Sequence, residues 1–144
     1  MLRTRVITAL VLVALLLPGL FLLPQTWWAL LAALFIGVAG WEWGGLLGLG
    51  DLRRLLLGAA LTVFCAAVAL LAPAAMGVGG GSGSEAPAAW VIATYLVAAG
   101  FWGVLVPCWL RAKWRLPRGL AGILIGLVVL FPTWLALVQI RIPG

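Results

Sequence analysis

Five long apolar stretches, separated by short polar or glycine-rich connections, make up almost the whole chain. A helix needs roughly 20 apolar residues to cross about 30 Å of hydrocarbon, and each stretch is close to that length. Because lipid offers backbone groups no hydrogen-bond partner, such segments must be helical. The pattern therefore predicts an all-α polytopic integral membrane protein with helices at about 6–23, 27–49, 55–78, 88–110 and 120–140.

The first stretch also has features of a signal peptide, since Arg3 and Arg5 precede an apolar core. That core is long for a signal sequence, and the following LLPQTWWALL has no clear small-x-small cleavage site. The pattern favours an uncleaved first helix over a signal peptide.

Basic residues occur in alternate connections. Arg3 and Arg5 lie at the amino terminus, two arginines lie in GDLRR, and four cations lie in RAKWRLPRG. The connections between them, PQT and GVGGGSGSEAP, hold no Lys or Arg. Eight of the nine basic residues thus lie on one predicted side, and Arg141 is the exception. This distribution predicts a cytoplasmic amino terminus by the positive-inside rule.

Tryptophans mark the predicted ends of the helices. The indole ring favours the membrane interface, where its N–H can stay in contact with water. We expect outer ends at Trp27, Trp28 and Trp90, and inner ends at Trp41, Trp43, Trp109 and Trp114.

The glycine- and serine-rich segment 79–87 predicts a flexible outer loop. It separates three helices from two but is too short to be a strong domain linker. Residues 1–144 are therefore expected to form a single membrane region.

The composition agrees with a lipid environment. The chain is 66% hydrophobic and 8% charged, and its mean hydropathy is +1.27. Soluble domains carry roughly 25% charged residues, so a water-soluble globule is excluded. The net charge of +6 would indicate nucleic acid in a soluble protein, but here the cations follow membrane topology. No nucleic-acid partner is expected.

Glu42 is one of only three acidic residues, and it lies between two tryptophans. It is about 22 Å along the second helix from Trp27, near the predicted cytoplasmic face. One interpretation pairs Glu42 at the interface with an arginine among Arg3, Arg5, Arg53 and Arg54. The other directs it inward, as a polar or lipid-binding group of a substrate cavity.

Gly40, Gly44 and Gly48 recur every fourth residue of the second helix. Residues four apart share a helix face, so these glycines predict a smooth groove for close helix packing. Packing within one subunit is favoured over a homodimer. Gly122 and Gly126 repeat the spacing in the fifth helix.

The segment RAKWRLPRG concentrates positive charge beside the membrane. Its cations could contact anionic lipid head groups or a nucleotide phosphate. The alternative, which we favour, is that they only set topology. The segment lacks the glycine spacing of a phosphate-binding loop. The residues concerned are Arg111, Lys113, Arg115 and Arg118.

Candidate catalytic groups are scarce. The chain has no histidine, and Cys65 and Cys108 are expected to be small packing residues. Metal-assisted phosphoryl chemistry requires clustered carboxylates, whereas Glu42, Asp51 and Glu85 are dispersed. We expect no catalytic residue and no bound metal or cofactor in this chain.

Two stretches resemble a known family. The start, MLRTRVITALVLVALLLP, and the later WWALLAALFIGVAGWEWGGLLGL are similar to the amino-terminal part of bacterial phosphatidate cytidylyltransferase. The distinctive residues are Arg3 to Ala9 and the Trp-Glu-Trp at 41–43. The later LPRGLAGILIGLVVLFPTWLALVQIR also looks like the middle helices of that family.

The resemblance implies a bacterial inner-membrane enzyme that joins CTP to phosphatidic acid, with Mg²⁺, to give CDP-diacylglycerol and pyrophosphate. The polar catalytic segments of that family, rich in Asp, Lys, Ser and His-Gly-Gly, are absent here. The chain is therefore expected to be an amino-terminal fragment that is inactive alone. The alternatives are a non-enzymatic membrane assembly protein and, third, a transporter subunit.

Overall fold

The computed structural model describes residues 1–77 and 88–141. Within these ranges the chain is helical with short connections and no strand, so the predicted all-α class is confirmed. Five helical spans are long and apolar enough to cross a membrane. The α-helices are α1 (Leu2–Leu22), α2 (Gln25–Leu46), α3 (Asp51–Leu71), α4 (Ala89–Gly100), α5 (Val106–Ala112) and α6 (Leu120–Gln139). The expected loop 79–87 lies outside the described residues.

Two shorter elements complete the chain. The 3₁₀ turn η1 (Pro73–Met76) follows α3. The π-helical segment η2 (Phe101–Leu105) joins α4 to α5, so that the fourth span runs continuously from Ala89 to Ala112. We predicted a regular helix here, and the π-helical segment is a local departure from that expectation.

The end of α2 is set by a glycine. Gly48 has a φ of 71°, a left-handed conformation that is easiest for a residue without a Cβ. Its N–H donates to the Gly45 carbonyl (3.0 Å), and the Leu49 N–H donates to the Gly44 carbonyl (3.1 Å). These two bonds form a Schellman motif. The helix therefore ends at Leu46 rather than at residue 49.

The most extensive helix pairing joins α2 to α3. At their crossing, a Cβ added to Gly58 would lie 2.5 Å from the Gly37 carbonyl oxygen. No side chain fits at that distance, so glycine at both positions lets the two backbones approach. Without a hydrophobic driving force between helices in lipid, such close van der Waals packing supplies much of the association energy.

Helix α6 packs on α2 and completes the core. Trp134 and Leu135 of α6 are fully buried with Ala29 and Ala33 of α2. The indole Nε1 of Trp134 donates to the Ala29 carbonyl at 3.1 Å. The small alanines thus make room for a large aromatic side chain whose polar atom is also satisfied.

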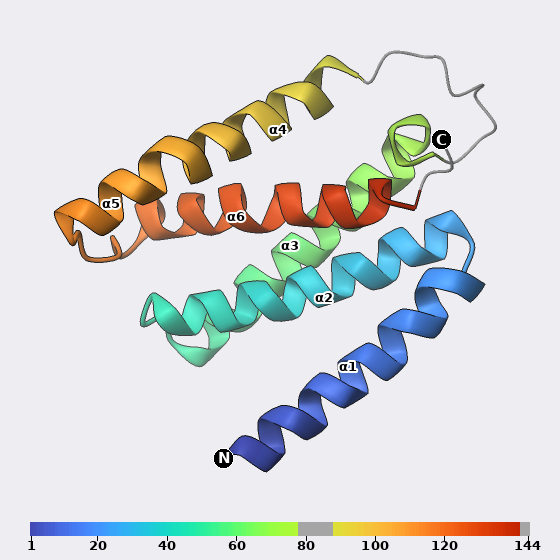
Figure 1. Ribbon diagram of the computed structural model, residues 1–144, viewed down its shortest axis with the longest axis horizontal. Coiled ribbons are helices and arrows are strands. Elements are labelled where there is room, and N and C mark those ends of the chain that lie inside the picture. The colour runs from blue at the N-terminus through green and yellow to red at the C-terminus, as the bar shows by residue number, and fades with distance from the viewer. Residues whose placement is uncertain (78–87, 142–144) are drawn as a thin grey trace.

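Two spans pack more loosely. In α1 only Gly19 is buried, and Figure 1 shows this helix leaning away from the others. In the span from Ala89 to Ala112 the buried residue is Val91. Its Cys108 is exposed, whereas Cys65 of α3 is fully buried. The packing role expected for both cysteines is therefore wrong for Cys108.

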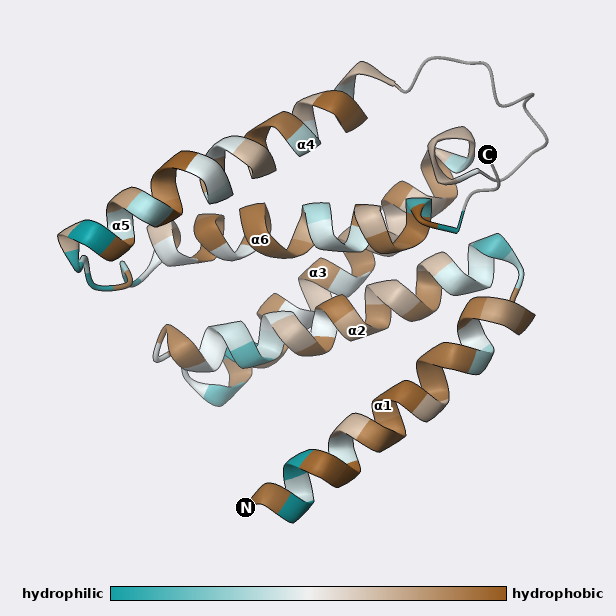
Figure 2. Cartoon of the chain, viewed as in Figure 1, coloured by the Kyte–Doolittle hydropathy of each residue, from teal (hydrophilic) through white to brown (hydrophobic). Residues whose placement is uncertain are grey.

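Basic residues gather at one end of the bundle. The amino terminus, the α2–α3 connection and the α5–α6 connection lie at the same end in Figure 1. Figure 2 shows hydrophilic colour concentrated at helix ends and hydrophobic colour along the spans. Eight of the nine Lys and Arg residues belong to these three segments. We call this end of the bundle the basic end.

Candidate functional site

Trp41 and Trp43 point to different helices at the basic end. Successive residues on an α-helix are about 100° apart, so residues at i and i+2 face nearly opposite directions. The Trp41 ring lies under the Arg54 guanidinium of α3, 4.6 Å from its centroid. The indole Nε1 of Trp43 donates to the Gly122 carbonyl of α6 at 3.0 Å. The two tryptophans therefore hold α2 between α3 and α6.

Glu42 lies between these tryptophans and is exposed. Within the described residues, Arg54 forms an ion pair with Asp51 at 3.7 Å. Glu42 forms no ion pair with any described residue. Arg54 also donates from Nε to the Trp41 carbonyl at 3.4 Å. Arg54, one of the four arginines considered as partners of Glu42, is thus directed to Trp41 and Asp51 instead.

The predicted glycine face is only partly correct. Gly40 and Gly44 are buried, and both lie against α3: a Cβ at Gly40 would clash with Leu61, and one at Gly44 would meet Arg54 at 3.1–3.4 Å. Gly48 is outside the helix, and a Cβ there would meet nothing within 4 Å. The face of α2 that carries Gly40 and Gly44 is filled within the chain, and Gly48 terminates the helix.

The glycines of α6 receive a tryptophan. A Cβ on Gly126 would lie 2.5 Å from Nε1 of Trp43, and a Cβ on Gly122 would clash with Leu47 and the Pro117 carbonyl. These glycines therefore allow the side chains that follow Glu42 to reach α6.

The basic segment at 111–118 follows a sharp helix end. Helix α5 ends at Ala112, and Lys113 adopts a left-handed conformation with a φ of 52°. Nε1 of Trp109 donates to the Trp114 carbonyl and closes this turn. All four cations of the segment are exposed, as expected for residues that contact head groups or water.

A cavity of about 490 Å³ opens beside this segment. We call it the inner cavity. Its walls come from α2, η2, α5, the α5–α6 connection and α6. The lining residues are mostly aromatic or aliphatic, with one cation: Trp43, Phe101, Trp102, Val106, Trp109, Leu110, Lys113, Trp114, Leu116, Ile125 and Val129.

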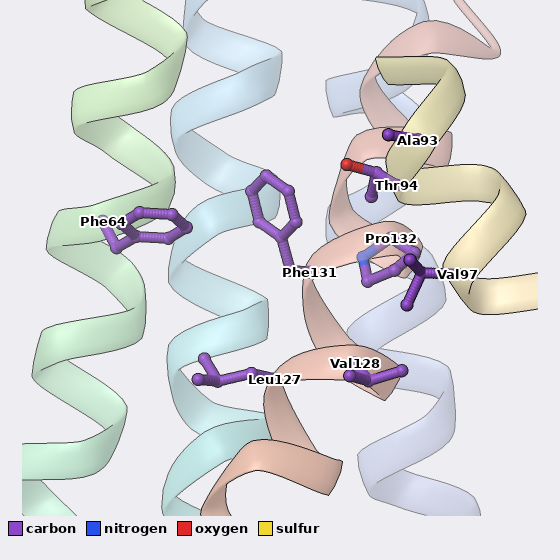
Figure 3. Close-up of a pocket in the computed structure, with 8 residues that line it drawn as sticks. All are labelled: Phe64, Ala93, Thr94, Val97, Leu127, Val128, Phe131 and Pro132. Carbon is purple, nitrogen blue, oxygen red and sulfur yellow. The ribbon is translucent and has the colours of Figure 1, made fainter. Parts of the chain in front are cut away.

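A second cavity, of about 470 Å³, lies between α3, α4 and α6. Figure 3 shows Phe64 and Phe131 on one side and Thr94 and Val97 on the other. The hydroxyl of Thr94 donates to the Trp90 carbonyl at 2.8 Å, so it is already bonded within its own helix. This mid-span cavity suits hydrocarbon and offers no charged group.

Hydrogen bonds at the opposite end of the bundle were not predicted. Gln25 and Trp28 of α2 donate to the carbonyls of Val138 (2.8 Å) and Leu137 (2.9 Å) in α6. Trp28 lies in the first turn of α2 and is 3% exposed, so its indole N–H bonds a protein carbonyl. Both donors lie in the first turn of α2, and the carbonyls that accept from them lie in the last turn of α6, where carbonyls lack intrahelical partners.

Gln139 connects three elements at that same end. Its Oε1 accepts from the Tyr95 hydroxyl of α4 at 2.7 Å, and its Nε2 donates to the Ala75 carbonyl of η1 at 3.2 Å. The amide side chain supplies both an acceptor and a donor, so one residue joins α4 and η1 to α6.

The carboxylates of the described residues can be compared with the ligands that Mg²⁺ needs. Mg²⁺ at a phosphoryl-transfer site is held by oxygen ligands, usually carboxylates and substrate phosphates. In the described ranges no three His, Cys, Asp or Glu side chains come together, and Asp51 is engaged by Arg54. The side chains of residues 1–77 and 88–141 therefore do not fit a magnesium site.

These features define a multi-pass helical membrane protein with a basic end and two largely apolar cavities. The chain is 31% identical, over 147 aligned residues, to a protein of Pseudomonas aeruginosa named phosphatidate cytidylyltransferase. The alignment covers 98% of this chain and 48% of that protein, so the chain spans about half the length of its curated relative. The resemblance to phosphatidate cytidylyltransferase that we noted in the sequence is confirmed by this alignment as a whole.

No family model matches the chain, and no solved structure matches it.

Proposed function

We propose that the chain is the amino-terminal membrane portion of a phosphatidate cytidylyltransferase in a bacterial inner membrane. That enzyme would join CTP to phosphatidic acid, releasing pyrophosphate and forming CDP-diacylglycerol. The observation that carries the proposal is the alignment of 98% of this chain with about half of a protein of that name. The amino-terminal position is supported by the family-like Arg-Thr-Arg-Val-Ile-Thr-Ala start at 3–9.

In this proposal the chain contributes structure and lipid contact, and does not transfer the cytidylyl group by itself. The dispersed carboxylates support this division, because they do not form a ligand set for the Mg²⁺ that the complete enzyme would use. CTP and phosphatidic acid would be partners of the complete enzyme.

A chimera tests the assignment. The stretch of the Pseudomonas aeruginosa protein that aligns with this chain would be replaced by residues 1–144, and CDP-diacylglycerol formation from radiolabelled CTP would be measured in membranes. We expect activity from the chimera. A well-inserted chimera without activity, beside an active parent enzyme, would count against the assignment.

The purified chain tests the division of labour. With CTP, phosphatidic acid and Mg²⁺ supplied, residues 1–144 should release no pyrophosphate above a protein-free control. The parent enzyme in the same lipid provides the positive control. Any CDP-diacylglycerol made by the isolated chain would refute this part of the proposal.

We also propose that the basic end faces the cytoplasm. The clustering of eight cations there supports this orientation through the positive-inside rule. Alkaline phosphatase fused after Leu23 should be active, and the same reporter fused after Leu49 should be inactive, because it works only outside the cytoplasm. The reverse pattern would contradict the orientation.

A further inference from the structure

The inner cavity lies where the fourth span departs from regular α-helix. The π-helical segment η2 contributes Phe101 and Trp102 to its wall, and α5 contributes Trp109. π-helical turns are rare and often occur at functional sites. A Cβ added at Gly100 or at Gly103 would meet no atom within 4 Å, so tight packing does not explain these glycines.

The mid-span cavity and the inner cavity have nearly equal volume but different chemistry. The mid-span cavity has an apolar lining and one hydroxyl that is already hydrogen-bonded. The inner cavity has an aromatic lining with Lys113 among the lining residues. Its volume of about 490 Å³ falls in the range of small-ligand sites.

Positive charge is concentrated in the α5–α6 connection that lines part of the inner cavity. Arg111, Arg115 and Arg118 lie within five positions of Lys113, and residues 86–144 contain no Asp or Glu. Cations beside a membrane attract anionic lipid head groups, and tryptophan side chains favour the same depth. The apolar wall of the cavity therefore matches the acyl chain of an anionic lipid, and Lys113 matches its phosphate.

We propose that the inner cavity binds one anionic phospholipid, with an acyl chain against the aromatic wall and the phosphate at Lys113. The proposal does not rest on the cytidylyltransferase assignment, because it requires only the described residues and a bilayer. It commits to a lipid of the surrounding membrane as the occupant, since the apolar wall has no role in binding free phosphate.

Native mass spectrometry of the purified 144-residue chain tests the site. The probes are phosphatidylglycerol and phosphatidylcholine with identical acyl chains, titrated separately in the same detergent. We expect one phosphatidylglycerol to be retained more tightly than phosphatidylcholine. Equal retention of the two lipids would overturn the proposal.

Charge variants locate the phosphate. Lys113→Gln should weaken phosphatidylglycerol binding about fivefold, the effect expected from one lost cation near a membrane surface. Lys113→Arg should retain binding. Arg3→Gln removes the same charge from the same end but from a residue outside the cavity lining. Equal losses in Arg3→Gln and Lys113→Gln would show a diffuse surface charge and overturn the site.

A pocket-filling variant tests the acyl chain. Ile125→Trp fills the cavity from α6 and keeps every charge, so phosphatidylglycerol retention should fall severalfold. Leu124→Trp adds the same side chain at a neighbouring exposed position outside the cavity lining and should leave retention unchanged. If the two variants bind phosphatidylglycerol equally, the cavity is not the site; Lys113→Gln still tests the proposal if Ile125→Trp fails to fold.

Discussion

The α2–α3 pair and the fourth span represent two ways of packing a membrane helix. At the α2–α3 crossing, glycines bring backbone against backbone, and Gly58 has no space for a Cβ. In the fourth span, a Cβ added to Gly103 would meet no atom within 4 Å. Helix α4 lines the mid-span cavity, and η2 and α5 line the inner cavity. Glycine thus occurs for different reasons at the two places: it allows close backbone approach at Gly58, whereas no neighbouring atom requires it at Gly103.

The largest expected effect comes from filling the close contact. Gly58→Ala should destabilise the fold by about 1–3 kcal/mol, because overpacking must shift a backbone carbonyl rather than a flexible side chain. Unfolding by SDS titration in mixed micelles measures the change. Gly103→Ala is the matched control and should cost nothing, since no atom lies near its new methyl group. An equal loss of stability in Gly58→Ala and Gly103→Ala would contradict the proposed difference in packing between the two regions.

A smaller effect is expected where hydrogen bonds hold the loosely packed span. Gln139→Leu removes its bonds to Tyr95 and Ala75, and should cost about 1 kcal/mol, as for other interhelical hydrogen bonds in membranes. Thr133→Val, which loses only a bond within its own helix, is the control on α6. Hydrogen exchange should also rise in α4 with Gln139→Leu. A stability unchanged by Gln139→Leu would show that this span is held by apolar packing alone.

Arg54 tests the α2–α3 pair at its charged edge. Arg54→Gln should lower stability by about 0.5–1 kcal/mol, because it removes a cation–π contact with Trp41. Arg53→Gln removes the same charge from an exposed neighbour and should have a smaller effect. The same SDS titration measures both variants. A larger loss of stability in Arg53→Gln than in Arg54→Gln would contradict the role that we give to Arg54.

Glu42 should have the smallest effect on folding. Glu42→Gln is expected to change the free energy of unfolding by less than about 0.5 kcal/mol, because the carboxylate is exposed and forms no ion pair in the described structure. The informative measurement is the activity of the chimera with the same change. Lost activity with unchanged stability would indicate substrate contact, whereas a large loss of stability would contradict the exposed position.

The apolar pattern was sufficient to predict the five spans, because lipid leaves a long apolar segment only the helical solution. It also predicted that Gly40 and Gly44 pack closely. The prediction that Gly48 belongs to the same face was wrong. The spacing of four residues does not reveal that Gly48 takes a left-handed conformation and ends the helix.

The site was harder to predict than the spans. The basic segment was recognised from charge, but the inner cavity depends on Trp43, η2 and α6 meeting in space. Likewise, Gln139 gives no sequence signal for its partners, since they lie 44 and 64 residues away. Spacing along one helix predicts which residues share a face, and does not predict which helix will cover that face.

The bonds from α2 to α6 have a consequence for how the chain is made. Gln25, Trp28 and Ala29 meet partners that lie 113, 109 and 105 residues later. At synthesis rates of about 5–20 residues per second, a partner 105 residues away emerges roughly 5–20 seconds later. During that interval α2 can already pair with α3, the next helix along the chain. The side chains of Gln25 and Trp28 have no partner in α6 until α6 has been made. Helix α6 is made well after α3, and it therefore completes the packing of α2 in a later step.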